Sequence, residues 1–180
     1  MLVDRPPAGP DWTHEIKHDG FRVLACKQGE RVKVWSRRGA DFTYRFTSIA
    51  DAVRSLNTDD ALIDGEAVVQ RIDGRSDFSA LRTNRGGAQA TLVAFDLLRL
   101  DDEDLQLRAI EARRKALSRL VDSTKAIVFS EALAAEGAVV FAKACELGLE
   151  GIVSKRAGSF FESGKSRNWP KTINPDFVRT

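Results

Sequence analysis

The sequence predicts an α+β fold, and three observations on its elements support this prediction. Apolar and polar residues alternate in 21–27 and 31–36, and the Gln28-Gly29-Glu30 link between them is typical of a hairpin. Helical spacing of apolar residues recurs further along the chain, at 46–56, 107–121 and 136–147. Strands and helices do not alternate regularly, which disfavours a doubly wound parallel sheet. The 180 residues suffice for one domain with its own core.

The remaining segments complete this pattern. Residues 1–11 are rich in Pro and Gly and predict an extended lead-in. A helical turn is expected at 78–82. Strands are expected at 61–72, with an interruption at Asp64-Gly65, and at 90–100, 126–130, 150–155 and 168–173.

Composition narrows the class of protein. Net charge is +2 although Lys and Arg total 28, so a basic surface would require segregation of charge. The start of the chain lacks the apolar core of a signal peptide, and no apolar run approaches bilayer length. Cys26 and Cys145 lie far apart without metal-ligand spacing, which favours free thiols. We therefore expect a cytoplasmic protein.

Charged residues stand beside apolar runs at several points of the chain. Each of them alone is most often a solvated side chain or a turn residue. Their recurrence in one small domain favours a cleft that binds a polyanion together with a divalent metal. The set comprises Lys17 with Asp19, Asp64-Gly65-Glu66, Asp96, Glu150, and Lys155 with Lys171.

Lys17 is the most informative of these residues, because it stands between a strand-like residue and an Asp-Gly turn. A lysine amine becomes a nucleophile when it loses its proton. Its ordinary pKa is about 10.4. Desolvation or nearby cations favour the neutral amine. Lys155 and Lys171 are the candidates for that second effect.

Six motifs in order give the chain a resemblance to a known family. They are Glu15–Arg22 (EIKHDGFR), Ser36–Gly39 (SRRG), Leu62–Glu66 (LIDGE), Phe95–Leu98 (FDLL), Glu150–Lys155 (EGIVSK) and Trp169–Lys171 (WPK). Together they resemble the covalent nucleotidyltransferases, and most closely the adenylation domain of ATP-dependent DNA ligases of the bacterial type. The resemblance implies one adenylation domain over 1–180. It also implies a nucleotidyltransferase (ATP-grasp-like) fold of two antiparallel-sheet subdomains flanked by helices, with the nucleotide cleft between them.

The resemblance also implies roles for individual residues, with ATP and Mg²⁺ as cofactors. Lys17 would attack the α-phosphate of ATP, expel pyrophosphate and become lysyl-AMP. Glu66 would contact the ribose and share the metal with Glu150. The nucleotide contacts expected for the other residues are Glu15 and Ile16 at the adenine edge, Phe95 and Val153 on the two faces of adenine, Arg22 and Arg37 at ribose and phosphate oxygens, and Lys155 and Lys171 at the α-phosphate.

Nicked double-stranded DNA is the partner that the resemblance implies. AMP would pass to the 5′-phosphate at the nick, and the 3′-hydroxyl would then displace it, in DNA repair or recombination near the bacterial nucleoid. Arg38, Lys33, Arg82, Arg85 and the Lys165–Arg167 loop are candidates to face the DNA backbone, and solvated loops are an equal interpretation. The resemblance gives no reason to expect a membrane.

Two departures from the family pattern leave alternatives open. Ile173 stands where the family commonly has a second lysine, and the sequence ends at Thr180, where the ligases continue into an OB-fold domain. An OB-fold or a repair partner supplied in trans would fill that role. The alternatives are a non-catalytic remnant that binds nucleotide or DNA, and an RNA ligase or capping-type nucleotidyltransferase. FDLL and EGIVSK favour the DNA branch over the latter.

Overall fold

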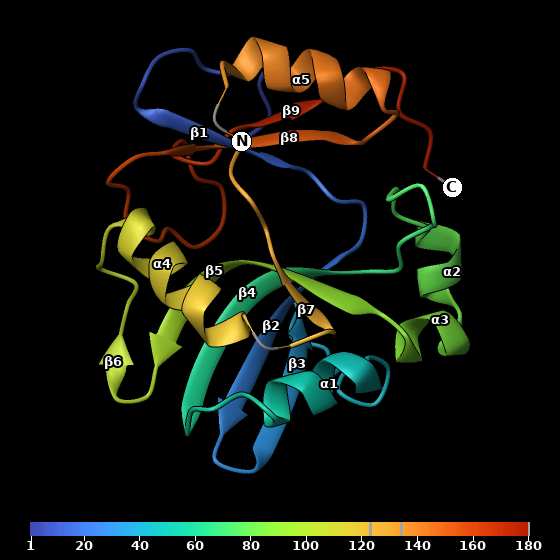
Figure 1. Ribbon diagram of the computed structural model, residues 1–180, viewed down its shortest axis with the longest axis vertical. Coiled ribbons are helices and arrows are strands. Elements are labelled where there is room, and N and C mark those ends of the chain that lie inside the picture. The colour runs from blue at the N-terminus through green and yellow to red at the C-terminus, as the bar shows by residue number, and fades with distance from the viewer. Residues whose placement is uncertain (123, 134, 180) are drawn as a thin grey trace.

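The computed structural model describes residues 1–122, 124–133 and 135–179, and it divides them into two lobes, each built on its own sheet (Figure 1). The large lobe holds a six-stranded sheet of order β3-β2-β4-β5-β6, with β7 paired to β5. Its strands are β2 (Phe21–Gln28), β3 (Arg31–Ser36), β4 (Asp60–Val68), β5 (Thr91–Leu100), β6 (Glu103–Asp104) and β7 (Ile127–Phe129). Its helices are α1 (Thr47–Arg54), α2 (Phe78–Arg82), α3 (Asn84–Ala88) and α4 (Ile110–Val121).

The small lobe consists of a three-stranded antiparallel sheet with one helix on it. The sheet order is β1-β8-β9, and α5 packs against β8 and β1. The elements are β1 (Trp12–Ile16), α5 (Gly137–Glu146), β8 (Gly151–Arg156) and β9 (Lys171–Ile173). The lead-in lies along β9, where Val3 N donates to Lys171 O and Lys171 N donates to Met1 O. The chain therefore enters the small lobe, builds the large lobe and returns to the small one.

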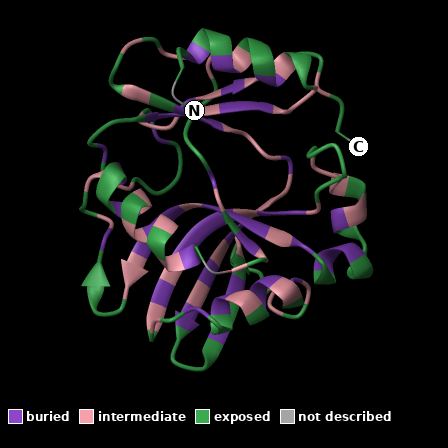
Figure 2. Cartoon of the chain, in the orientation of Figure 1, coloured by how far each residue is buried: buried purple, intermediate pink, exposed green. Residues whose placement is uncertain are grey.

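Alternation along the strands fixes which face of the large sheet is covered. Buried residues recur along the strands of the large sheet (Figure 2). Val23 and Ala25 of β2 are fully buried, as is Val34 of β3, and they face the core with α1. Helix α1 places Ile49 and Val53 on the same side, one turn apart. Four phenylalanines seal one end of this core in edge or tilted contacts, namely Phe21, Phe42, Phe46 and Phe78.

The expected interruption of the strand at Asp64-Gly65 is wrong, because β4 runs through both residues. The pairing with β5 instead shifts register between Asp64 and Gly65, as at a β-bulge. A side chain at Gly65 would lie 2.8 Å from the carbonyl oxygen of Val93, so the close approach of β5 requires glycine. The strand ends at Val68 rather than at residue 72, because the chain then turns into a short hairpin closed by the Gln70–Ser76 bridge.

Several other predicted boundaries move inward, and three elements were missed. The strand expected at 168–173 is limited to β9, because Pro170 has no N–H to donate; Asn168 and Pro170 still accept hydrogen bonds from Arg156 and Ser154 of β8. The helix expected from residue 107 begins at Ile110. The elements that the sequence analysis did not predict are β1, α3 and β6. The sheets are antiparallel as expected, apart from the parallel pair of β5 and β7.

A fully buried ion pair ties α4 to the large sheet. Arg113 donates two hydrogen bonds to the carboxylate of Asp96 on β5, at 2.8 and 3.0 Å. It also donates to the carbonyl oxygens of Arg108 and Ser159, at 2.6 and 3.1 Å. Both side chains of the pair have no exposed surface. A buried charge is tolerated only when it is paired and hydrogen-bonded in this way.

Two further features concern the cysteines and the helices. Cys26 and Cys145 are free thiols, partly buried. In the described part of the chain, no helix combines the length and the apolar character that a membrane crossing requires.

Removing Arg113 should destabilise the fold strongly. Arg113→Ala leaves the Asp96 carboxylate buried without its partner, which costs about 3–5 kcal/mol. The free energy of unfolding, measured by urea titration, is expected to fall by that amount. Arg119→Ala, an exposed site on the same helix, should change it by less than about 0.5 kcal/mol. Equal losses in the two variants would contradict the assigned role of the pair.

Candidate active site

A cavity lies between the lobes and gathers most of the residues that the sequence analysis singled out. Its walls include residues of β1, β8 and β9 of the small lobe and of β2, β4 and β5 of the large lobe. The expected residues on its lining are Glu15, Ile16, Lys17, Arg22, Glu66, Phe95, Val153, Lys155 and Lys171, and His18, Ser130 and Trp169 join them. Arg37 and Glu150 lie outside this lining and border neighbouring hollows.

Lys17 lies just after β1, where the chain leaves the small lobe. Its backbone N–H donates to Gly151 O, which fixes the residue beside the start of β8. Its amine lies 2.6 Å from a carboxylate oxygen of Glu150, and the two side chains are 19% and 11% exposed. The nucleophile candidate is therefore held as half of a partly buried ion pair at the edge of the cavity.

The Glu15 carboxylate occupies the opposite, closed end of the cavity. One of its oxygens accepts from Arg114 at 2.6 Å and lies 2.7 Å from the Lys155 amine. The other accepts from the Ser130 hydroxyl at 2.7 Å. Glu15 and Lys155 are each only 2% exposed. Two of these three partners, Arg114 and Ser130, were not singled out from the sequence.

The Lys155 side chain lies at this closed end and is held there by several contacts. Besides its pair with Glu15, its amine donates to Phe95 O at 3.1 Å and lies 4.9 and 4.4 Å from the rings of Phe95 and Trp169. Burial lowers the pKa of Lys155, while Glu15 acts in the opposite direction. The α-phosphate role expected for this lysine would require the Glu15 pair to open, whereas Lys171 is free of an ion pair in the described part of the chain.

An aromatic wall and an aliphatic one bound the middle of the cavity. Phe95 of β5 meets Trp169 edge to face, with ring centroids 6.0 Å apart. Val153 lies on β8, directly across from Glu15 in the strand register. Both Phe95 and Val153 are half-buried and line the cavity. The slot suits a flat heteroaromatic ring with one polar edge, which is how Phe95 and Val153 were expected to act.

Glu66 and Lys171 lie near Lys17. Burial raises the pKa of Glu66 to about 7, although Lys17 and Lys171 both act to lower it. The pKa of Lys171 is lowered by burial and by the charges of Lys17 and Arg22. Burial and the surrounding cations therefore both favour a neutral amine at Lys171, and Glu66 changes charge near neutral pH.

Arg22 and Arg37 differ in their surroundings. Arg22 donates two hydrogen bonds to the buried carboxylate of Asp64, at 3.0 and 2.5 Å, and its guanidinium lies 5.6 Å from the Phe95 ring. Its remaining donors border the cavity. Arg37 is exposed in the turn after β3. The structure therefore brings Arg22 into the site and leaves Arg37 at its outer rim.

A wider hollow of about 1080 Å³ opens from Lys17 across β2 and β3. Six cationic side chains line it, against the acidic Asp19 and Glu66: Lys17, Arg22, Arg37, Arg38, Lys171 and Arg179. Arg179 reaches it from the end of the chain, and its guanidinium lies 2.6 Å from the Asp19 carboxylate and 4.4 Å from the Phe78 ring. Charge is thus segregated to this face despite the small net charge, and the hollow suits phosphate groups.

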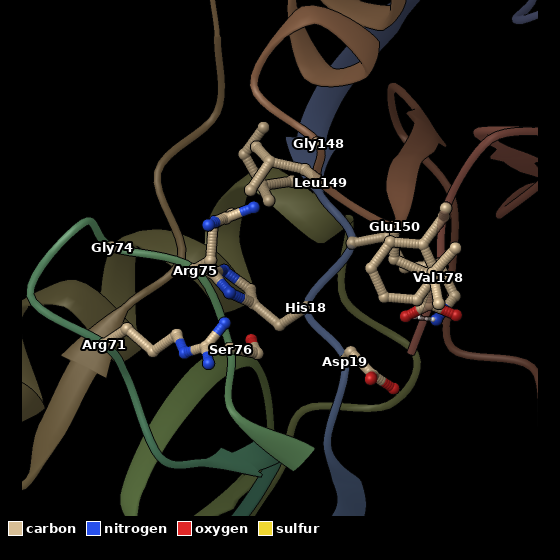
Figure 3. Close-up of a pocket in the computed structure, with 13 residues that line it drawn as sticks. His18, Asp19, Arg71, Gly74, Arg75, Ser76, Gly148, Leu149, Glu150 and Val178 are labelled. Carbon is tan, nitrogen blue, oxygen red and sulfur yellow. Dashed lines mark ion pairs between the residues drawn. The ribbon is translucent and has the colours of Figure 1, made fainter. Parts of the chain in front are cut away.

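A third hollow of about 650 Å³ lies behind Lys17 and Glu150. Figure 3 shows Arg71 and Arg75 reaching it from the hairpin after β4, and His18 turned toward that hairpin. Gly148 and Leu149 close it from the small lobe, and Val178 closes it from the end of the chain (Figure 3). Burial lowers the pKa of His18, so its imidazole is neutral at pH 7.

The carboxylates near Lys17 fit a Mg²⁺ ion that is held partly by substrate. Within the described residues there is no group of three or more His, Cys, Asp or Glu side chains able to hold a metal alone. Mg²⁺, however, is commonly bound by one or two carboxylates together with phosphate oxygens and water. Among the described residues, Glu150 has Lys17 as its only ion-pair partner, so its carboxylate has capacity for a cation.

Comparison with known proteins agrees with this geometry. A family model described as the ATP dependent DNA ligase domain matches residues 6–172. The chain belongs to the ATP-dependent DNA ligase family.

This ligase domain is similar to proteins from several bacteria and archaea. It is 37% identical over 175 residues to the multifunctional non-homologous end joining protein LigD of Pseudomonas aeruginosa, covering 94% of this chain and 21% of that protein. It is 32% identical to the DNA ligase of Thermococcus fumicolans, covering 91% of this chain and 32% of that one. The solved structure of a mycobacterial DNA ligase D complexed with ATP and MES matches with a TM-score of 0.78 at 31% identity, covering 96% and 59% of the two chains.

These matches confirm the family and the fold class that the sequence predicted. The ligase domain spans about a fifth of the length of the LigD relative and a third of the archaeal one. The roles of its individual residues remain predictions.

The pH dependence of stability tests the environment of Glu66. With a pKa of about 7 in the folded chain and 4.5 as the ordinary value, folded Glu66 retains a proton that the unfolded chain loses between these two pH values. The charged carboxylate therefore costs stability as pH rises through this window, and the cost is full above it. Relative to wild type, Glu66→Gln should gain up to about 3 kcal/mol in free energy of unfolding between about pH 4.5 and about pH 8.

Urea titration of the two proteins at both pH values measures this gain. Glu30→Gln, at an exposed position, serves as the control and should stay within about 0.5 kcal/mol of wild type at each pH. A Glu66→Gln difference that does not change with pH would show that Glu66 is not buried as described.

Proposed function

We propose that this ligase domain forms a covalent adenylate on Lys17 and passes the AMP to the 5′-phosphate of nicked DNA. One observation carries the proposal. The Lys17 amine lies against Glu150 at the edge of a cavity that is lined by the aromatic wall and by cationic side chains. A base would lie against Phe95 and Val153, and the triphosphate would extend toward Lys17 and Lys171.

The chemistry follows from the position of the amine. Its lone pair attacks the α-phosphorus, the N–P bond forms, and the bond to the bridging oxygen breaks, so that pyrophosphate leaves with the electron pair. The ammonium must first lose a proton, and the Glu150 carboxylate at 2.6 Å lies within reach of it. Burial and the charges of Lys17 and Arg22 lower the pKa of the neighbouring Lys171.

Mg²⁺ would be held by Glu150, with Glu66 close by, and would neutralise charge on the phosphate oxygens when bound. Cationic groups of the chain contribute in the same sense. Arg22 is oriented by Asp64 and keeps donors for ribose or phosphate oxygens. Its planar fork gives a directional contact that a lysine would not provide.

The cationic hollow beside Lys17 supports the second half of the proposal. Its side chains include Arg37, Arg38 and Lys171, and it opens at the nucleophile itself. A 5′-phosphate bound there would reach the adenylate, and its oxygen would attack the phosphorus and release the Lys17 amine. The 3′-hydroxyl at the nick would then displace AMP. Lys33 is less available for DNA, because Asp41 pairs with it at 2.7 Å.

We further propose that the biological setting is the joining of DNA ends. Relatives from Pseudomonas and Mycobacterium, 37% and 33% identical, carry the name multifunctional non-homologous end joining protein. An OB-fold, in the same polypeptide or from a partner, would complete the grip on DNA that the cationic hollow begins. Ile173 removes one of two expected lysines, so the phosphate end depends more on Lys171.

Incubation with ATP and Mg²⁺ should add the mass of one AMP to the chain, as read by intact-protein mass spectrometry. Lys17→Ala should abolish the adduct, because it removes the proposed nucleophile. Lys143→Ala, which changes an exposed lysine on α5, should leave it unchanged. Pyrophosphate should release the label by reversing the reaction. Absence of an adduct at high ATP would contradict the catalytic proposal and would indicate a domain that only binds nucleotide or DNA.

The same assay with GTP separates the DNA-ligase activity from that of a capping-type enzyme. We expect AMP labelling to exceed GMP labelling by at least about tenfold, since one hydrogen bond gained or lost at a buried polar group has that effect on a rate constant. The measurement is the ratio of initial labelling rates at equal nucleotide concentration. Preferential GMP labelling would overturn the choice of ATP.

A further inference from the structure

The partners of Glu15 determine how its carboxylate meets a ligand. The residue lies on β1 of the small lobe, is 2% exposed, and contributes to the lining of the cavity. One carboxylate oxygen accepts a hydrogen bond from Arg114 and pairs with Lys155, and the other accepts a hydrogen bond from the Ser130 hydroxyl. A carboxylate has about four lone-pair sites. Three of these sites are occupied by Arg114, Lys155 and Ser130. Glu15 can therefore accept one more hydrogen bond, on the oxygen that accepts from Ser130.

Arg114 holds this arrangement from the other lobe. It projects from α4 and is 11% exposed. One of its terminal nitrogens donates to Glu15 at 2.6 Å and to Phe95 O at 3.4 Å, and the other donates to Ser130 O at 2.6 Å. Its guanidinium also lies 4.6 Å from the ring centroid of Phe129. The Arg114 guanidinium therefore contacts Glu15, Ser130 and the backbone of Phe95 at once, and it fixes their relative positions.

Ser130 has its own anchor. Its backbone N–H donates to Ala94 O at 2.8 Å, which continues the pairing of β7 with β5 beyond the last residue of β7. Ser130 is 5% exposed, and its hydroxyl donates to Glu15. With Arg114 on its carbonyl and Glu15 on its hydroxyl, Ser130 has little freedom to rotate. The orientation of the carboxylate is thus set by the large lobe.

We propose that Arg114 and Ser130 are positioning residues that set the preference for adenine over guanine nucleotides. They hold the Glu15 carboxylate as a fixed acceptor at the closed end of the slot. Adenine carries an amine donor at its C6 position, whereas guanine carries a carbonyl acceptor there. The Glu15 carboxylate, held in place, accepts a hydrogen bond from the adenine amine. Against guanine it would face a carbonyl oxygen, and two acceptors repel each other. This inference rests on the proposed function, because it takes the slot to be a nucleotide-base site.

The size of the effect depends on how firmly the carboxylate is held. Without Arg114, Glu15 keeps Lys155 and Ser130 but loses one of its two contacts with the large lobe. The carboxylate can then turn, the adenine contact weakens, and the repulsion of guanine is relieved. Because a hydrogen bond to a charged group is involved, the discrimination ratio should fall by about tenfold or more. A purely structural role would weaken both nucleotides alike and leave the ratio unchanged.

The experiment measures binding without chemistry. The probes are the α,β-methylene analogues of ATP and GTP, in which carbon replaces the bridging oxygen that leaves when Lys17 attacks. Calorimetric titration gives the ratio of their dissociation constants for wild type, Arg114→Met, Arg114→Lys and Ser130→Ala. The matched control is Lys115→Met, the next residue on α4, which is exposed. Far-UV circular dichroism confirms that each variant is folded.

We expect wild type and Lys115→Met to favour the ATP analogue by the same factor. Arg114→Met should reduce this factor by about tenfold or more, with Ser130→Ala and Arg114→Lys between the two. Ser130→Ala alone decides the matter if Arg114→Met fails to fold. Unchanged ratios in the variants, or no preference in wild type, would overturn the inference. A preference that depends on Arg114 in a chain that forms no AMP adduct would uphold it and defeat the catalytic proposal instead.

Discussion

The carboxylate of Glu15 is the constraint on which the shape of the site depends. It belongs to β1 of the small lobe, yet two of its three partners, Arg114 and Ser130, belong to the large lobe. A buried carboxylate without partners would be strongly unfavourable, so the lobes must meet where these donors converge. Lys155 is paired at the same point, which places its amine close to the rings of both Phe95 and Trp169. The polar end of the slot and its aromatic wall therefore follow from a single buried charge.

The two ends of the site differ in how their charges are paired. At the closed end, Glu15 and Lys155 are sealed from solvent and each makes several polar contacts, so their arrangement is rigid. At the open end, Lys17 and Glu150 remain partly exposed and share one contact. Partly exposed pairs exchange partners at small cost. This contrast suits the proposed reaction, in which a base would be held still while the groups around a phosphate change their charges and their partners.

Sequence reasoning reached the features that are local and missed those created by tertiary contact. Alternation along β2 and β3 and the apolar spacing of α1 are properties of neighbouring residues, and they predicted these elements well. Helix α3 contains Gly86 and Gly87, which lowers its helix propensity, and it forms because Thr83 caps it and Gly87 packs against the backbone of Arg45. The motifs placed Lys155 at the phosphate, but its partner is fixed by the fold. Arg114 is 99 residues from Glu15, so no spacing in the sequence connects the two.

Trp169 gives this arrangement an optical consequence. Its indole lies edge to face with Phe95 and 4.4 Å from the Lys155 amine, on the lining of the slot itself. The two other tryptophans, Trp12 and Trp35, are absent from that lining. Indole emission responds to nearby charge and to the stacking of other rings. The domain thus contains an intrinsic fluorophore at the point where a base would enter, and occupancy of the slot can be followed in real time without attaching a dye.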